Sequence, residues 1–241
     1  MQITYDKQTI NASNPLARFA HRSRIALGLG MVSARCPHGG TVVDFGAGPG
    51  LFLHRLGQAR PDLSLAGLDP YKTPDYPEIR YLAEMDAQPS DSVDMLTAFE
   101  VCEHLYADEV DTFLDDALRI LRPSGTLIIS VPVMYGVAIV PKLLNGMVSE
   151  RTLRMDHTPG EALRALMGLP VMRPDNPRHT HKGFDFRKLR AQVSTRFDVE
   201  AESTSPLRQL PWWLSSQYFM ICRPRQGGST APAPSQPKNS L

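Results

Sequence analysis

The chain has few cysteines, almost no net charge and no uninterrupted apolar run. Its 241 residues include three cysteines, an odd number, and two of them lie inside apolar stretches. This pattern argues against a disulfide framework and is typical of a reducing compartment, so we expect a cytoplasmic location. The 26 basic and 25 acidic side chains leave a net charge of +1. No overall field therefore directs the chain to nucleic acid or to a membrane.

Segments that target or anchor a protein to a membrane are also lacking. Residues 1–19 contain no basic stretch followed by an apolar one, which argues against a secretory signal. The longest nearly uncharged apolar stretch, residues 131–148, is interrupted by prolines, glycines and a lysine. We therefore expect no transmembrane segment. Contact of an apolar segment with a membrane surface stays open.

Short β-branched and apolar runs alternate with helical patterns along the chain, in a composition that is 42% hydrophobic and 21% charged. This alternation predicts an α/β fold in which helices cover both faces of a mostly parallel sheet. Strands are predicted at residues 41–45, 63–68, 79–82, 93–98, 126–131, 197–202 and 218–222, and helices at residues 15–34, 51–58, 107–121, 137–147, 159–166 and 187–194.

The domain organisation follows from where this alternation starts, breaks and ends. Residues 1–37 form a helical extension, and residues 38–223 form the main domain. Inside that domain, residues 133–180 interrupt the rhythm and are predicted to be an inserted lid over the site. Residues 224–241 are rich in proline and contain no aromatic residue, so we expect a disordered tail.

A glycine-rich loop joins the first predicted strand to the next helix. Gly46, Gly48 and Gly50 let the main chain approach a ligand closely, and the helix N-terminus supplies unpaired amide donors. A dinucleotide-binding fingerprint, GxGxxG, would need glycine at position 51, where the chain has Leu51. The GxGxG spacing thus disfavours a nicotinamide-dependent oxidoreductase.

With an acidic residue in front of it, this loop resembles that of the class I S-adenosylmethionine-dependent methyltransferases. The resemblance covers residues 38–131 by motif and continues to residue 223 by strand order. It implies a Rossmann-like, seven-stranded sheet with an antiparallel last strand, S-adenosylmethionine as the cofactor, and methyl transfer as the reaction. The loop residues that the resemblance assigns to the cofactor are Asp44, Gly46, Ala47, Gly48 and Gly50.

Two further markers of this family follow the loop. Asp69, at the tip of the second predicted strand, would accept hydrogen bonds from the ribose hydroxyls, and Pro70 would adjoin the cofactor. The alternative is a turn-forming Asp before proline. Asp86 and Ala87 match the pair that holds the adenine amino group. Met85 would pack either on the adenine ring or in the core.

The fourth marker is the segment SVDMLTAFEVCEHL, residues 92–105, which resembles the fourth strand of the family. Phe99 and Glu100 lie at its carboxyl end, where ligands bind in open α/β sheets. We expect Phe99 to contact the cofactor and Glu100 to take part in catalysis.

A metal site is suggested by ExxEH, which Glu100, Glu103 and His104 form, together with His181 further along. Such ligands suit magnesium or manganese, and the two imidazoles equally suit zinc or iron. The set resembles the metal-dependent small-RNA terminal 2′-hydroxyl methyltransferases and the quinone-biosynthesis O-methyltransferases. Similar segments also occur in the superfamily without a metal, where Glu100 would line the pocket and Glu103 and His104 would begin the next helix as surface or capping residues. His181 is then a catalytic base or an anchor of the lid.

The acceptor is the least constrained part of the prediction. Methyl transfer from a sulfonium mainly requires positioning of the nucleophile and exclusion of water. We expect a hydroxyl, or less favourably a nitrogen, of a small molecule, glycan or lipid-linked compound. The apolar segment after residue 132 would cover such an acceptor or simply pack on the core, and Trp212 and Trp213 would line the same mouth or close the last strand pair.

Two rival hypotheses stay open. Residues 173–190 carry six basic and two acidic side chains with aromatic residues between them, a pattern that can grip single-stranded RNA. A solvated helix face explains the same charges more simply, so nucleic acid is disfavoured without being excluded. The other hypothesis is a partner subunit that keeps the fold without catalysis. The oligomeric state is not predicted.

Overall fold

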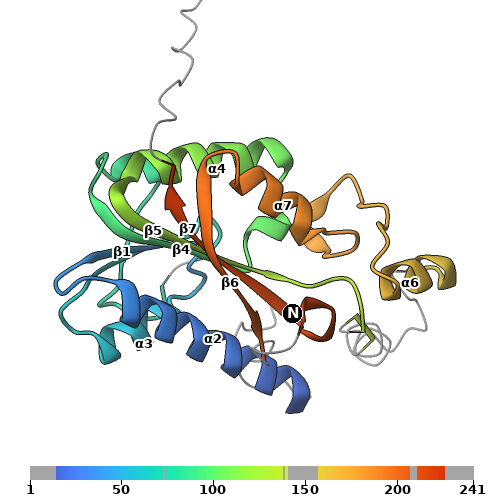
Figure 1. The fold of residues 1–241 in the computed structure, drawn as a ribbon. Coiled ribbons are helices and arrows are strands. Elements are labelled where there is room, and N and C mark those ends of the chain that lie inside the picture. Colours follow the sequence, from blue (N-terminus) through green and yellow to red (C-terminus); the bar gives the residue numbers. More distant parts are fainter. Residues whose placement is uncertain (1–14, 73, 138, 141–156, 207–210, 226–241) are drawn as a thin grey trace, which may run out of the picture.

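The computed structural model describes residues 15–72, 74–137, 139–140, 157–206 and 211–225. In these residues one twisted sheet lies between two layers of helices (Figure 1). The strands are β1 (Thr41–Phe45), β2 (Ser64–Leu68), β3 (Arg80–Tyr81), β4 (Val93–Phe99), β5 (Leu121–Pro132), β6 (Phe197–Ser205) and β7 (Gln217–Pro224).

The seven strands follow the order β3-β2-β1-β4-β5-β7-β6. Strand β7 runs antiparallel to both of its neighbours, whereas every other pair in the sheet is parallel. The predicted α/β fold, with its seven strands and its antiparallel last strand, is confirmed. The order reverses at β1, which lies between β2 and β4, and ligands of open α/β sheets bind beside such a reversal.

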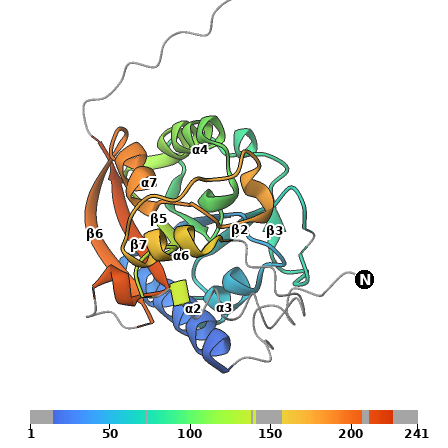
Figure 2. The same cartoon turned by 90° about the vertical axis from the view of Figure 1, so that its right-hand side faces the viewer.

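The helices cover both faces of the sheet, as predicted. Helices α2 (Pro15–Arg35) and α3 (Leu51–Ala59) lie on one face, and α4 (Ala107–Ile120) and α7 (Phe186–Val193) lie on the other (Figure 1). Helix α6 (Pro159–Leu166) lies beyond the end of β5 and faces the viewer in Figure 2. Single 3-10 turns are η1 (Met85–Ala87), η2 (Cys102–His104), η3 (Pro177–His179) and η4 (Trp212–Leu214).

Helix α4 shows why the sequence forms these elements. Its buried side chains include Val110, Phe113, Leu114 and Ala117, spaced to form one apolar stripe. At its start, the main-chain amide of Tyr106 donates to the Glu109 carboxylate at 2.9 Å, which satisfies a donor that the helix itself leaves unpaired. The stripe packs on one face of the sheet, and a second buried cluster around Leu53 and Leu56 fills the other face.

The element boundaries differ from the prediction mainly at β5. The strand begins at Leu121 instead of residue 126, and its pairing with β4 shifts register between Val93 and Met95. Arg122 holds this early part in place because its guanidinium donates to the Asp94 carboxylate at 2.8 Å. The tail beyond residue 225 and most of the helix predicted at residues 137–147 lie outside the described residues.

Helix α2, predicted as an extension before the core, packs on α3 and buries Leu27, Met31 and Val32 in the same apolar cluster as the first strand. In the described part of the chain, no helix combines the length and the apolar character needed to span a membrane.

Candidate active site

The glycine loop adopts a main-chain path that side chains would obstruct. Gly46 and Gly50 have φ angles of 75° and 91°, in the left-handed region that favours glycine. A Cβ atom on Gly46 would lie 2.2 Å from Cγ2 of Val101, which follows β4. The amides of Gly46 and Ala47 both donate to the carbonyl of Leu68, at 2.7 and 3.0 Å. The loop is therefore held against the ends of β2 and β4.

Asp69 connects this loop to the end of β2. One carboxylate oxygen accepts from the amide of Gly48 at 2.9 Å, and the other accepts from the amide of Tyr71 at 2.8 Å. The bond to Tyr71 is the turn that the alternative interpretation expected. A carboxylate offers about four acceptor positions, so half of them stay available for ribose hydroxyls. Structural and binding roles are compatible in this residue.

Asp44 is buried beneath the loop. The Thr97 hydroxyl donates to its carboxylate at 2.6 Å. Burial raises the pKa of Asp44 to about 7, the nearby charge of Asp69 raises it further, and the hydrogen bond from Thr97 opposes the rise. The carboxyl is thus poised near neutral pH, and a cationic ligand in contact with it would favour its ionised form.

A small pocket lies between α2 and the glycine loop. Its volume is about 50 Å³, far below the roughly 300–1,000 Å³ of common ligand sites. Its walls come from α2, the loop, the start of α3 and the end of β4, namely His21, Arg24, Ile25, Asp44, Gly46, Ala47, Pro49, Leu51, Phe52 and Phe99. Phe99 therefore lies where the sequence placed it, beside the loop.

Glu100 points its carboxylate to α2. Its Oε2 lies 3.2 Å from Nη1 of Arg24, whose Nη2 in turn lies 2.7 Å from Nδ1 of His21. Burial lowers the pKa of His21 to about 4, and the neighbouring Arg24 and Arg55 charges add to this effect. Neutral His21 thus accepts from Arg24. Sequence reasoning did not single out His21, although its spacing of three from Arg24 on one helix face was a usable signal.

The main chain of Glu100 is strained, with a φ of 59° in a residue that is not glycine. Such conformations gather at functional sites. Glu100 lies between the end of β4 and η2, next to Val101, whose side chain lies against Gly46.

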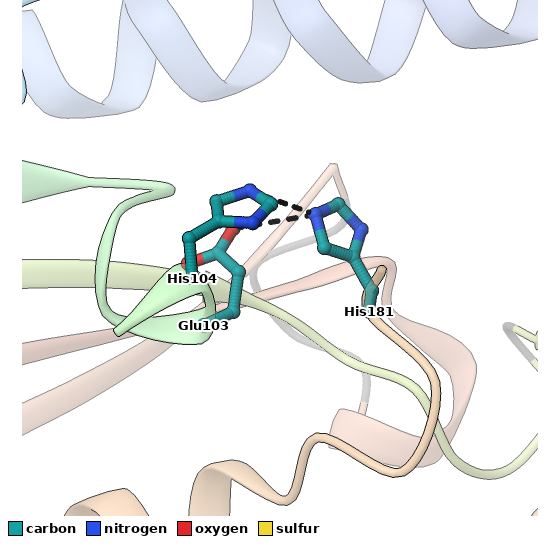
Figure 3. Close-up of side chains that lie close together, drawn as sticks. All are labelled: Glu103, His104 and His181. Carbon is teal, nitrogen blue, oxygen red and sulfur yellow. Dashed lines mark hydrogen bonds and ion pairs between the residues drawn. The ribbon is translucent and has the colours of Figure 1, made fainter. Parts of the chain in front are cut away.

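Three of the four predicted metal ligands come together in what we call the histidine cluster: Glu103, His104 and His181 (Figure 3). The Nε2 atoms of the two imidazoles are 3.1 Å apart, and Oε1 of Glu103 is 3.9 Å from Nε2 of His181. Glu103 is fully buried, and burial lowers the pKa of His104. Arg173 fixes the turn by donating to the main-chain carbonyl of Glu103 at 2.6 Å.

The pair expected at the adenine lies at the surface of η1. The Asp86 side chain is 81% exposed, and one of its oxygens lies 3.4 Å from Arg119. The amide of Ala87 donates to the carbonyl of Glu84 at 3.2 Å. Met85 is buried in the core, which fits the second of its two interpretations. Pro70 is exposed beside Asp69.

The basic side chains of residues 173–190 are largely engaged inside the protein. Arg178 pairs with Glu109 and lies over the ring of Tyr106. Lys182 lies 2.9 Å from Glu161 of α6. Arg187 and Arg190 likewise have carboxylate partners, Asp185 and Glu202.

Solved structures of low identity share this fold. A protein from Pyrococcus horikoshii OT3 has a TM-score of 0.56 at 14% identity, over 92% of this chain and 97% of that one. The magnesium protoporphyrin IX methyltransferase of Synechocystis PCC 6803, solved with bound SAH, has a TM-score of 0.52 at 13% identity, over 93% and 90%. A cyclopropane synthase from Mycobacterium tuberculosis has a TM-score of 0.51 at 20% identity, over 81% and 67%.

These likenesses, together with the strand order and the glycine loop, define the class: the fold is that of the class I methyltransferases. Residues 17–192 match the family described as a methyltransferase domain. No curated protein matches the chain. Because the family match spans more than half of its length, the chain belongs to this family of S-adenosylmethionine-dependent methyltransferases.

Proposed function

We propose that this methyltransferase transfers the methyl group of S-adenosylmethionine to a hydroxyl of a small molecule, glycan or lipid-linked acceptor. The proposal is based on two features that lie at one edge of the sheet, the glycine loop with Asp69 and the histidine cluster. The glycine loop with Asp69 suits the cofactor, and the histidine cluster begins two residues after Val101, which packs on Gly46. A hydroxyl nucleophile needs a group that accepts its proton or lowers its pKa, and the histidine cluster offers such groups.

In this proposal the ribose hydroxyls bind the open acceptor positions of Asp69. The methionyl end, which carries an ammonium and a carboxylate, faces the pocket, where Asp44 and Arg24 supply opposite charges and Arg24 is in turn paired with Glu100. Asp86 and Ala87 take the adenine at the surface of η1. Since α2 closes over the loop, it must shift or yield to admit the whole cofactor.

The nature of the acceptor is supported by charge and by exposure. Arg173, Arg178 and Lys182 already have hydrogen-bond or ion-pair partners within the protein, so they are poorly suited to bind phosphate groups. This favours a small acceptor over RNA. Near the same edge, Leu163 of α6 is 55% exposed and Met172 is 81% exposed. Such side chains suit an acceptor with an apolar part.

The test is methyl transfer from isotopically labelled S-adenosylmethionine into fractionated metabolite, lipid and glycan extracts. We expect label in a product whose methyl group is ether-linked, as shown by mass spectrometry. His181→Asn should lose most of the turnover, whereas His179→Asn, an exposed histidine of the same segment, should retain it. Label on nitrogen, on carbon or on RNA would contradict the proposed acceptor class. Cofactor binding without transfer to any fraction would favour the partner-subunit hypothesis.

A further inference from the structure

The histidine cluster has the composition of a metal-binding site. Two imidazole nitrogens and one carboxylate oxygen, from two segments 77 residues apart, lie within 4.8 Å of one another. Figure 3 shows the rings of His104 and His181 presenting their Nε2 atoms to each other, with the Glu103 carboxylate beside them. Two histidines and one carboxylate form a ligand set that leaves open coordination positions on the metal.

We propose that Glu103, His104 and His181 bind one divalent cation of the zinc class, with its open position directed to the acceptor hydroxyl. Binding of the cation stands on the geometry of these three residues, and only its use in catalysis rests on the proposed function. Glu100 is not a ligand in this proposal, because the group of converging ligand atoms consists of Glu103, His104 and His181, and the Oε2 atom of Glu100 lies 3.2 Å from Arg24.

The distances are close to those of a loaded site. With bonds of about 2.0–2.2 Å, neighbouring ligand atoms around a metal lie roughly 2.8–3.6 Å apart. The two Nε2 atoms, at 3.1 Å, already fit this range. The Glu103 oxygen is 3.9 Å from Nε2 of His181, and the ligand atoms of the cluster lie within 4.8 Å of one another, so the carboxylate must move toward the imidazoles when a metal binds.

The burial of Glu103 is a second argument for a metal site. Glu103 has no exposed surface, and buried carboxylates are paired or coordinate metals. The guanidinium of Arg173 donates to the main-chain carbonyls of Glu103 and Leu105 and so fixes the turn that carries the carboxylate. Its charge also interacts with that of Glu103, so a bound cation would share this carboxylate with Arg173.

The donor atoms select among cations. Two nitrogen ligands and one oxygen suit zinc, cobalt or iron(II), whereas magnesium and calcium prefer oxygen ligands throughout. We therefore expect zinc or cobalt to bind far more tightly than magnesium, which narrows the wider range of metals that the sequence allowed.

The bound cation would act as a Lewis acid on the acceptor. The acceptor hydroxyl, placed on the open position, loses its proton to water more readily because the positive charge stabilises the alkoxide. The oxygen then forms a bond to the methyl carbon while the carbon–sulfur bond breaks, and the sulfonium becomes a neutral thioether. No oxidant or reductant is required.

Binding is tested with the full chain after removal of metal by a chelator. Zinc chloride, cobalt chloride and magnesium chloride are titrated calorimetrically, and the cobalt-loaded protein is examined for visible absorption bands of a nitrogen and oxygen site. The variants are Glu103→Gln and His181→Asn, and the matched control is His179→Asn, an exposed histidine two residues from the cluster. His181 is 40% exposed, so its substitution should leave folding intact.

We expect one zinc per chain, with affinity at least 100-fold lower in Glu103→Gln and His181→Asn than in the control. Losses of about 10- to 100-fold already follow from changes to residues that merely support a ligand. The cobalt bands should disappear with the same two variants. Zinc binding that is absent, or equal in His181→Asn and His179→Asn, overturns the proposal, as does tighter binding of magnesium than of zinc.

Titration of S-adenosylmethionine into the same samples separates the two claims. Zinc binding without cofactor binding would remove the proposed function and leave the metal site standing. If the natural chain binds the cofactor and transfers the methyl group but binds no zinc, the proposed metal site is wrong and the proposed function still holds.

Discussion

Single residues of the glycine loop show most directly how sequence becomes function here. Gly46 is required twice, because its φ of 75° disfavours any side chain and because a Cβ would collide with Val101. The lack of a side chain brings the end of β4, and with it the segment of Glu100, against the loop. Glycine at position 46 thus lets the loop lie against Val101 while it forms part of the pocket wall.

Gly46→Ala should therefore lower the free energy of unfolding by more than the strain of a left-handed alanine, which is about 1–2 kcal/mol, and should abolish cofactor binding. The matched control is Gly39→Ala, where φ is 70° but no atom lies within 4 Å of the added Cβ. Urea unfolding and calorimetric titration of S-adenosylmethionine measure both effects. Equal losses in the two variants would show that the contact with Val101 has no role.

Asp44 gives a prediction for pH. Its pKa is raised from 3.8 to about 7 in the fold, so between these values the folded protein holds a proton that the unfolded chain has released. The free energy of unfolding should then fall as pH rises from 4 to 7, by roughly 4 kcal/mol at most.

An asparagine at position 44 cannot titrate, so the free energy of unfolding of Asp44→Asn should not fall between pH 4 and 7. The difference in stability between Asp44→Asn and the natural protein should therefore shift in favour of the variant as pH rises. Urea unfolding at several pH values checks this, with the exposed Asp75→Asn as the control. Parallel profiles for the Asp44 variant and the natural protein would contradict the raised pKa.

At this scale the sequence located the loop residues, Asp69 and Phe99, because their order along the chain is a sufficient signal. It did not predict the ion pair of Glu100 with Arg24, whose partners are 76 residues apart. Nor could composition show that Arg173 and Arg178 turn inward to a carbonyl and a carboxylate. Contacts between distant segments leave no periodic trace in a sequence.

At the scale of elements, helix α2 closes the cofactor side of the protein. It supplies His21, Arg24 and Ile25 to the pocket and packs on α3. The helix carries two glycines that differ in their surroundings: a Cβ on Gly28 would lie 3.1 Å from the Phe99 ring, whereas Gly30 has no atom within 4 Å.

Gly30→Ala should thus stabilise the protein by about 1 kcal/mol, the gain from removing a helical glycine, and leave cofactor affinity unchanged. Gly28→Ala should be less stabilising than Gly30→Ala and should weaken cofactor binding, because the added methyl group would press on the ring of Phe99, which lines the pocket. Thermal unfolding and cofactor titration measure the pair. Identical behaviour of the two variants would show that the contact of α2 with Phe99 does not matter for binding.

Most helices and strands could be predicted from the sequence. The boundaries of α6 and β5 show why one was predicted and the other was not. Helix α6 was predicted at its observed bounds from its helical pattern, and in the structure Thr158 and Glu161 form a capping box at its start, with Pro159 in the first turn. The start of β5 was missed, because residues 121–125 contain proline and glycine, which ordinarily end a strand. Pairing with β4 and the contact of Arg122 with Asp94 outweigh that local preference.

At the scale of the whole molecule, the strand order sets where chemistry can occur. The reversal at β1 places the loop after β1, the tip of β2 and the end of β4 at one edge of the sheet. A short connection through η2, residues 100–106, and a second connection that includes residues 157–185 then bring the histidine cluster to that edge. The alternation of strands and helices predicted the fold, whereas the path of the second connection could not be predicted because it follows no repeating pattern.

The proposed function depends on binding of S-adenosylmethionine through Asp69 at this edge of the sheet. The most direct test is calorimetric titration of the full chain with S-adenosylmethionine and S-adenosylhomocysteine, compared with Asp69→Ala and with Asp75→Ala, an exposed aspartate of the same connection. We predict saturable one-to-one binding of both ligands that weakens about 100-fold in Asp69→Ala, through loss of hydrogen bonds to a charged acceptor, and is retained in Asp75→Ala. Binding of neither ligand, or equal binding by Asp69→Ala and the natural protein, would contradict the account.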